Sequence, residues 1–155
     1  GSTLFHTLAT GWAMIADTLP ILLFQVVFLW LYCVRVIGLS WRGRYALLGL
    51  FFTTVIGFGL LPQYWLNGSV GYLPALLFLT GLGIFHYKTG QKQRWLLLTA
   101  ALLFTVSLGF RTSDMALCST FPVGVHFMWH LLNGVVLYLA SAALMFNYKP
   151  KDGGG

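Results

Sequence analysis

Two histidines, His126 and His130, are four residues apart at the start of a long apolar segment. In an α-helix this spacing places both imidazoles on one face, one turn apart. That arrangement suits two ligands of one metal ion, and it also suits two buried histidines that hydrogen-bond to neighbouring helices. No glutamate stands between them, so the pair is not the HExxH motif of zinc proteases. Any general base must therefore come from elsewhere in the chain.

Ser2 and His6 form a second pair with the same spacing near the start of the chain. His6 could supply a third nitrogen ligand, with the Ser2 hydroxyl one turn away on the same helical face. Three protein ligands and one open position are typical of a catalytic zinc site, whereas structural zinc sites are usually closed by four. The alternative for Ser2 is a small residue for helix packing, or a hydroxyl bonded to a backbone carbonyl.

Asp17 is the candidate acid, although it lies eleven residues after His6. On one continuous helix that separation is about 16 Å, which is too far to share a metal site. Gly11 offers a break, because glycine can end a helix in the left-handed conformation. The chain would then reverse its direction. Asp17 would lie at the same side of the membrane as His6, His126 and His130. The alternative for Asp17 is an acid near a helix N-terminus, favoured by the helix dipole.

The segment from Arg111 to Pro122 is expected to be a loop on the same side as these residues. It carries Cys118, a possible fourth ligand, and Asp114, which could pair with Arg111 or help to admit a substrate. His86 is expected to be an interfacial residue at the opposite end of the molecule. Arg35, near a helix end, is expected to extend toward the headgroups of the lipids.

The composition determines what must position these residues. Hydrophobic residues make up 58% of the 155 residues and charged residues only 8%, far below the roughly one quarter found in soluble domains. A transmembrane helix needs roughly 20 mostly apolar residues. The sequence therefore predicts an all-α, polytopic transmembrane bundle as one domain over 1–148, with a disordered tail at 149–155. The long apolar segments lie at 13–37, 45–61, 71–87, 95–110 and 125–146, and a shorter one lies at 1–10.

Eight of the nine basic residues fall at three places that alternating helices would bring to one side of the membrane. These places are the junctions 35–44 and 88–94, and the C-terminal tail. Because loops rich in lysine and arginine stay in the cytoplasm, we expect a cytoplasmic C-terminus and a candidate site toward the other side. Such placement also argues against nucleic acid as the partner. The two cysteines, Cys33 and Cys118, are expected to be free thiols.

Taken together, these motifs resemble the alkaline ceramidase family, and bacterial ceramidase-like membrane proteins most closely. The sequence G-S-T-L-F-H at 1–6 matches the family's G-S-x-x-F-H stretch, and A-D-T-L-P at 16–20 is similar to its D-E-x-P stretch. G-V-H-F-M-W-H-L-L-N-G at 124–134 looks like the family's last transmembrane helix. The order of these residues is shared by a wider superfamily that includes the progestin and adipoQ receptors. The resemblance extends over essentially the whole chain.

The resemblance implies a seven-helix fold, of which about five full spans and a partial one are expected here. It also implies a zinc ion held by His6, His126 and His130, and hydrolysis of the amide bond of ceramide. Asp17 then matches the acid beside the zinc-bound water, and Ser2 matches the hydroxyl near the site. The expected partners are a lipid substrate and the membrane itself. The expected location is the inner membrane of a bacterium.

Two departures from the family pattern stand out. The first helix and part of the second are expected to be missing, with the acidic segment that family members use for calcium. Thr18 occupies the position where many eukaryotic members have glutamate.

A receptor that keeps the zinc architecture, or a hydrolase of another lipid, fits the same residues. The oligomeric state does not follow from the sequence.

Overall fold

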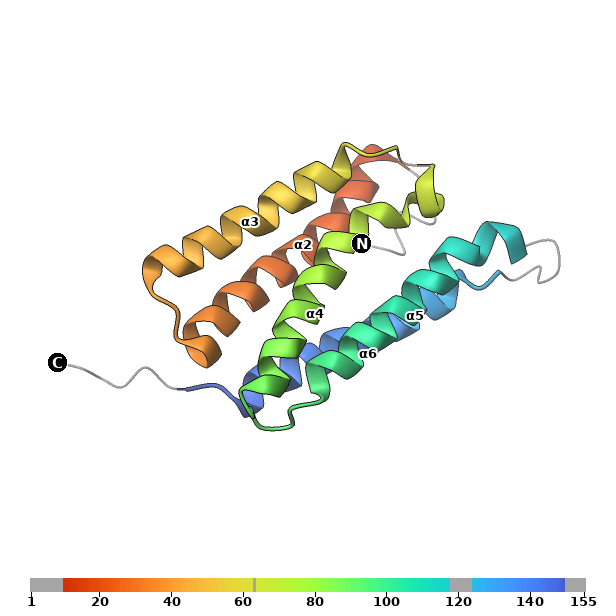
Figure 1. Ribbon diagram of the computed structural model, residues 1–155. Helices are drawn as coiled ribbons and strands as arrows, with labels where there is room; N and C mark the ends of the chain where they lie inside the picture. Colours follow the sequence, from red (N-terminus) through yellow and green to blue (C-terminus); the bar gives the residue numbers. More distant parts are fainter. Residues whose placement is uncertain (1–9, 63, 118–123, 150–155) are drawn as a thin grey trace.

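The computed structural model describes residues 10–62, 64–117 and 124–149, and every regular element in these ranges is helical. The helices run back and forth along one bundle, with α5 and α6 packed side by side (Figure 1). This confirms the predicted all-α transmembrane class. The elements are α2 (Gly11–Tyr32), η1 (Cys33–Ile37), α3 (Trp41–Gly59), η2 (Trp65–Tyr72), α4 (Leu73–Lys88), α5 (Leu96–Leu117) and α6 (His126–Phe146).

Four helical segments in the described ranges are long and apolar enough to cross a membrane: Gly11–Ile37, Trp65–Lys88, Leu96–Asp114 and His126–Phe146. The segment 45–61 was also expected to span the membrane. It corresponds to the 19-residue helix α3, which is not one of these four segments. Arg42 and Arg44 stand in the first turn of α3 and lower its hydropathy. The sixth, partial segment at 1–10 lies outside the described residues, apart from Thr10.

The start of α2 corrects one expectation and refines another. Thr10 is extended (φ −100°, ψ 157°) and α2 begins at Gly11, so a helix does begin close to the predicted break. Gly11 itself is helical and is not among the residues with positive φ, so the predicted left-handed cap is wrong. Pro20 lies inside α2, where its missing N–H leaves one backbone carbonyl of the preceding turn without its helical partner.

The segment Arg111–Leu117 was expected to be a loop, but it continues helix α5. Three polar or charged side chains in this extension contact other elements, as described below. The helix therefore continues because tertiary contacts hold its last turns, not because its sequence is apolar.

At the opposite end, a π-helix and a left-handed glycine join α2 to α3. The π-helix η1 covers Cys33–Ile37, and Gly38 caps it with φ 75°. Ser40 then begins α3 by accepting a hydrogen bond from the Gly43 amide at 3.4 Å. A π-helix is rare and is found most often where function demands a local change of helix geometry.

Two apolar clusters form the core. One joins α2, η1, α3, α4, the start of α5 and the C-terminal half of α6 around Tyr32 and Phe51. The other joins α5 and the first half of α6 around Phe104 and Trp129. Many large apolar side chains outside these clusters are exposed on the helices, as is expected of surfaces that face lipid.

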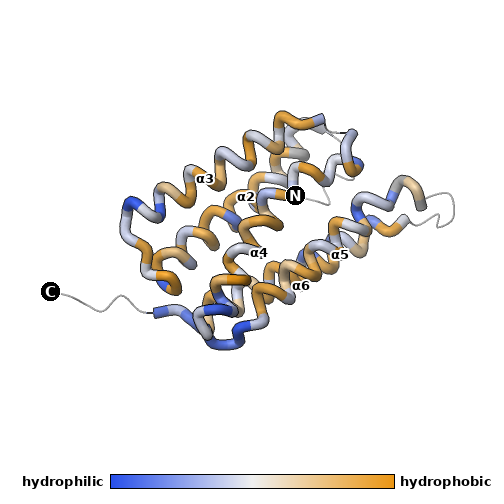
Figure 2. Tube along the Cα trace, in the orientation of Figure 1, coloured by the Kyte–Doolittle hydropathy of each residue, from blue (hydrophilic) through white to orange (hydrophobic). Residues whose placement is uncertain are grey.

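All described basic residues except Arg111 gather at one end of the bundle, which we call the basic end; Figure 2 shows hydrophilic segments there. The opposite end, where α2 and α6 begin, is called the site end. His86 was expected to be interfacial, but it is fully buried near the basic end. It hydrogen-bonds to the Tyr32 hydroxyl and lies 3.2 Å from the Lys92 carbonyl oxygen. Asn147 binds the Lys92 backbone from the other side, so a polar network ties α2, α4 and α6 together.

Candidate metal and lipid site

His126 and His130 lie at the start of α6, at the site end of the bundle. Their ring centroids are 4.9 Å apart and the rings are inclined by 70°. This confirms that the two imidazoles share one face of the helix. Neither residue is buried: the His126 side chain is 34% exposed, and His130 is exposed. A small ion could therefore reach both rings.

Asp114, near the end of α5, fixes the first turn of α6. Its Oδ1 atom accepts hydrogen bonds from the backbone amides of Val125 at 2.7 Å and His126 at 3.0 Å. The first amides of a helix have no partner within the helix, so Asp114 supplies the cap from another element. Its Oδ2 atom lies 3.9 Å from Nδ1 of His126. That distance is too long for a hydrogen bond, but it places a carboxylate beside one ring nitrogen.

The structure does not show the pairing of Arg111 with Asp114 that the sequence suggested. Its guanidinium donates hydrogen bonds to the Asn67 carbonyl at 2.8 Å and the Ser69 hydroxyl at 3.0 Å. The same group lies over the rings of Tyr72 and Trp129, at 5.0 and 5.8 Å from their centroids. Arg111 therefore joins α5 to η2 and to α6, and it supports two aromatic residues that line the cavity described next.

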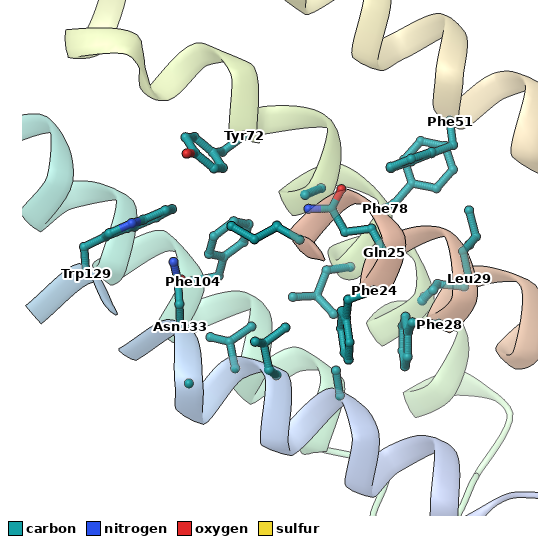
Figure 3. Close-up of a pocket in the computed structure, with 18 of the residues that line it drawn as sticks. Phe24, Gln25, Phe28, Leu29, Phe51, Tyr72, Phe78, Phe104, Trp129 and Asn133 are labelled. Carbon is teal, nitrogen blue, oxygen red and sulfur yellow. The ribbon is translucent and has the colours of Figure 1, made fainter. Parts of the chain in front are cut away.

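A cavity of about 310 Å³ opens between the helices below this end (Figure 3). Asp17 from α2 and His130 from α6 both line it, so the structure brings the predicted acid and one predicted ligand to the same space. Most of the remaining wall is apolar or aromatic. It includes Phe24, Phe28, Tyr72, Phe78, Phe104 and Trp129.

The cavity is elongated along the helices. Its lining on α2 extends from Asp17 to Leu29, which corresponds to roughly 18 Å at about 1.5 Å per residue. Half of the hydrocarbon core of a bilayer is about 15 Å thick. The cavity is therefore deep enough for an acyl chain from one leaflet, with Asp17 and His130 at one extremity.

Two carboxamides interrupt the apolar wall. Gln25 reaches from α2 into the cavity, and Asn133 lies on α6 near Trp129 (Figure 3). The Ser107 hydroxyl lies 3.2 Å from Asn133 Oδ1 and 3.1 Å from the Trp129 carbonyl oxygen, so these two acceptors share its one proton. This small network holds α5 against α6 one turn after His130.

The described residues test part of the predicted ligand set. His126 and His130 come together, whereas Ser2, His6 and Cys118 lie outside the described residues. Within those ranges no three residues of the metal-binding types converge. The described residues thus supply two imidazoles one turn apart, with the Asp114 carboxylate beside one of them. These are two of the three nitrogen ligands expected of a zinc site, and the residues present fit that metal.

Sequence reasoning missed the role of Asp114. Local capping rules consider residues directly before a helix, but Asp114 precedes α6 by twelve residues and belongs to another helix. Only the packing of α5 against α6 could reveal it. Its acidic type was the one available signal, since the chain contains only three acidic residues.

No family model matches this chain, and neither a curated protein nor a solved structure matches it.

Proposed function

We propose that this chain is a membrane-embedded, zinc-dependent hydrolase that cleaves the amide bond of ceramide or a similar N-acyl lipid. The observation that carries the proposal is the position of the histidine pair. His130 lines the same deep apolar cavity as Asp17, and His126 contacts it one helical turn away. The resemblance of the motifs to the alkaline ceramidase family supports the same reaction.

His126 and His130 would hold the zinc ion, with His6 as the third ligand. Bound zinc supplies a Lewis acid that polarises a carbonyl and lowers the pKa of water. Asp114 would position His126 through the first turn of α6 and through its carboxylate beside Nδ1. Such outer carboxylates orient metal ligands and keep them basic.

The protein side chains would manage the protons. Asp17 would accept a proton from the attacking water and then return it to the leaving amine. The Ser2 hydroxyl would orient the water or donate a hydrogen bond to the developing oxyanion. The aromatic wall around Phe24 and Phe104 would exclude bulk water and hold the acyl chain. The substrate would enter sideways from the bilayer, with its amide at the site end.

The membrane setting belongs to the same proposal. Four apolar spans make the chain an integral membrane protein, and we place it in a bacterial inner membrane. The basic end would face the cytoplasm by the positive-inside rule. The amide bond would then be cleaved near the non-cytoplasmic surface.

Release of fatty acid from ceramide by the purified protein tests the proposal. Turnover should stop when a chelator removes zinc and return when zinc is added. Bound zinc without turnover on ceramide or other N-acyl lipids would favour a receptor of the same superfamily.

A cavity-filling variant adds a check on the site of the acyl chain. Gly134 lines the cavity, and a Cβ atom there would meet no atom within 4 Å. Gly134→Leu should slow cleavage of long-chain amides more than of short-chain ones. Gly109→Leu is the matched control, since Gly109 has the same open space but does not line the cavity.

A further inference from the structure

A second pocket lies at the basic end, far from the histidines. Its volume is about 370 Å³, and it lies between the end of α2, the π-helix η1, the start of α3 and Lys149. Three of its lining residues are cationic: Arg35, Arg44 and Lys149. None of the described residues that line it is acidic. We call this space the basic pocket.

Arg35 enters the basic pocket from the π-helix with an unused donor. Its Nε atom is buried and has no hydrogen-bond partner among the described residues. Its guanidinium lies over the Tyr148 ring, 4.9 Å from the centroid. A buried N–H group of a charged side chain is costly unless something accepts its hydrogen bond. The Arg35 guanidinium therefore has a donor that no described residue uses.

Arg44 and the tail complete the wall. The Nε atom of Arg44 donates to the Leu39 carbonyl at 2.7 Å, and its guanidinium lies 5.9 Å from the Trp30 ring centroid. These contacts use one of the five donors of that guanidinium. The backbone amide of Lys149 donates to the Arg35 carbonyl at 3.3 Å, which holds Lys149 beside the π-helix.

The described part of the chain places no carboxylate side chain near these cations. Of the chain's three acidic residues, Asp17 and Asp114 lie at the site end, and Asp152 lies outside the described residues. Three positive charges around one pocket repel each other, and an anion that enters the pocket relieves this repulsion.

We propose that the basic pocket binds a phosphate group, presented by an anionic lipid headgroup or by a phosphate-containing solute. Arginine forks bind phosphate oxygens in pairs, with charge-assisted hydrogen bonds. Basic pockets between transmembrane helices are known to hold phosphorylated headgroups. The π-helix contributes by giving Arg35 a position that a regular helix would not provide. This inference does not depend on the reaction proposed for the site end.

The first arm of the test measures lipid binding by native mass spectrometry of the purified protein. Dioleoylphosphatidylglycerol should bind as one retained lipid per chain, and dioleoylphosphatidylcholine should not. Lys149→Gln and Arg35→Gln should each weaken phosphatidylglycerol binding by roughly fivefold or more. Arg94→Gln is the matched control, because Arg94 lies at the same end but does not line the pocket.

The second arm separates the two sources of phosphate. Inorganic phosphate is titrated into the protein in a zwitterionic detergent, and the melting temperature is followed. A rise that Lys149→Gln abolishes assigns the pocket to phosphate itself, whereas no rise together with lipid retention assigns it to a headgroup. If Arg35→Gln fails to fold, Lys149→Gln decides, since it lies at the end of the described chain.

The proposal is overturned if neither probe binds. It is also overturned if Arg94→Gln loses as much phosphatidylglycerol as Lys149→Gln does, because general surface charge would then explain the retention.

Discussion

Asp17 is a carboxylate at one extremity of a mostly apolar cavity. It lies on the second turn of α2 and lines the same cavity as His130. The alternative role for Asp17 was an acid that stabilises the helix N-terminus. Asp17 is not in the first turn of α2, so its interaction with the helix dipole would be weak. A proton-transfer role therefore accounts for its position better than helix stabilisation does.

Replacement of Asp17 by asparagine keeps the shape of the side chain but removes the base. In the proposed mechanism Asp17→Asn should retain zinc and lower turnover of ceramide by about 10²–10⁴-fold. Metal analysis and a fatty-acid release assay on the same preparation measure both quantities. Unchanged turnover would remove Asp17 from the mechanism.

Asp114 has two separable roles, and two substitutions distinguish them. Asp114→Asn keeps an oxygen for the amides of Val125 and His126 but removes the charge beside Nδ1. It should weaken zinc binding by about 10–100-fold, as measured by competition with a chelator of known affinity. Asp114→Ala also leaves both amides unbonded and should lower the free energy of unfolding by about 1–3 kcal/mol. Equal melting temperatures for Asp114→Ala and the parent protein would contradict the capping role.

At the scale of elements, α4 and α5 meet at a close contact that depends on Gly83. A Cβ atom on Gly83 would lie 3.0 Å from the Leu98 side chain and 3.2 Å from the backbone of Leu97 and Leu98. Small residues allow such close approach between membrane helices. This contact brings α5, with Phe104, against the wall of the cavity.

Gly83→Ala should therefore destabilise the bundle by about 1–3 kcal/mol through overpacking. Gly81→Ala is the matched control on the same helix, because its Cβ would meet nothing within 4 Å; it should leave the melting temperature unchanged or raise it slightly, since alanine favours helix. Thermal unfolding in detergent compares the two variants. Equal effects would show that α4 and α5 do not pack as closely as described.

The sequence predicted the helices well and their ends less well. Hydropathy located α2, α4, α5 and α6, because a membrane demands long apolar segments. It could not predict that Arg111–Leu117 continue α5, because contacts with η2 and α6 decide this. The spacing of His126 and His130 predicted their shared face, since a helix fixes that relation locally. The cavity, the role of Asp114 and the burial of His86 depend on which helices pack together, and spacing along one chain does not determine this.

For the whole molecule, the two ends of the bundle carry different chemistry. The described basic residues other than Arg111 and the basic pocket lie at one end, while the histidine pair and two of the three aspartates lie at the other. The positive-inside rule relates this polarity to the orientation in the membrane.

Single cysteines can report that orientation on intact cells. With Cys33 and Cys118 replaced by serine, Tyr64→Cys at the site end should react with a membrane-impermeant maleimide. Thr89→Cys at the basic end should react only after the membrane is permeabilised. Both positions are exposed, so access through the membrane decides the outcome. The reverse labelling pattern would contradict the proposed orientation.

The zinc content of the purified protein and of its His126→Ala and His130→Ala variants tests whether these histidines hold a metal ion. We expect about one zinc ion per chain in the parent protein and a large loss of zinc in both variants, with the bundle still folded. A parent protein without zinc, or variants that retain all of it, would contradict the assignment of these histidines as metal ligands.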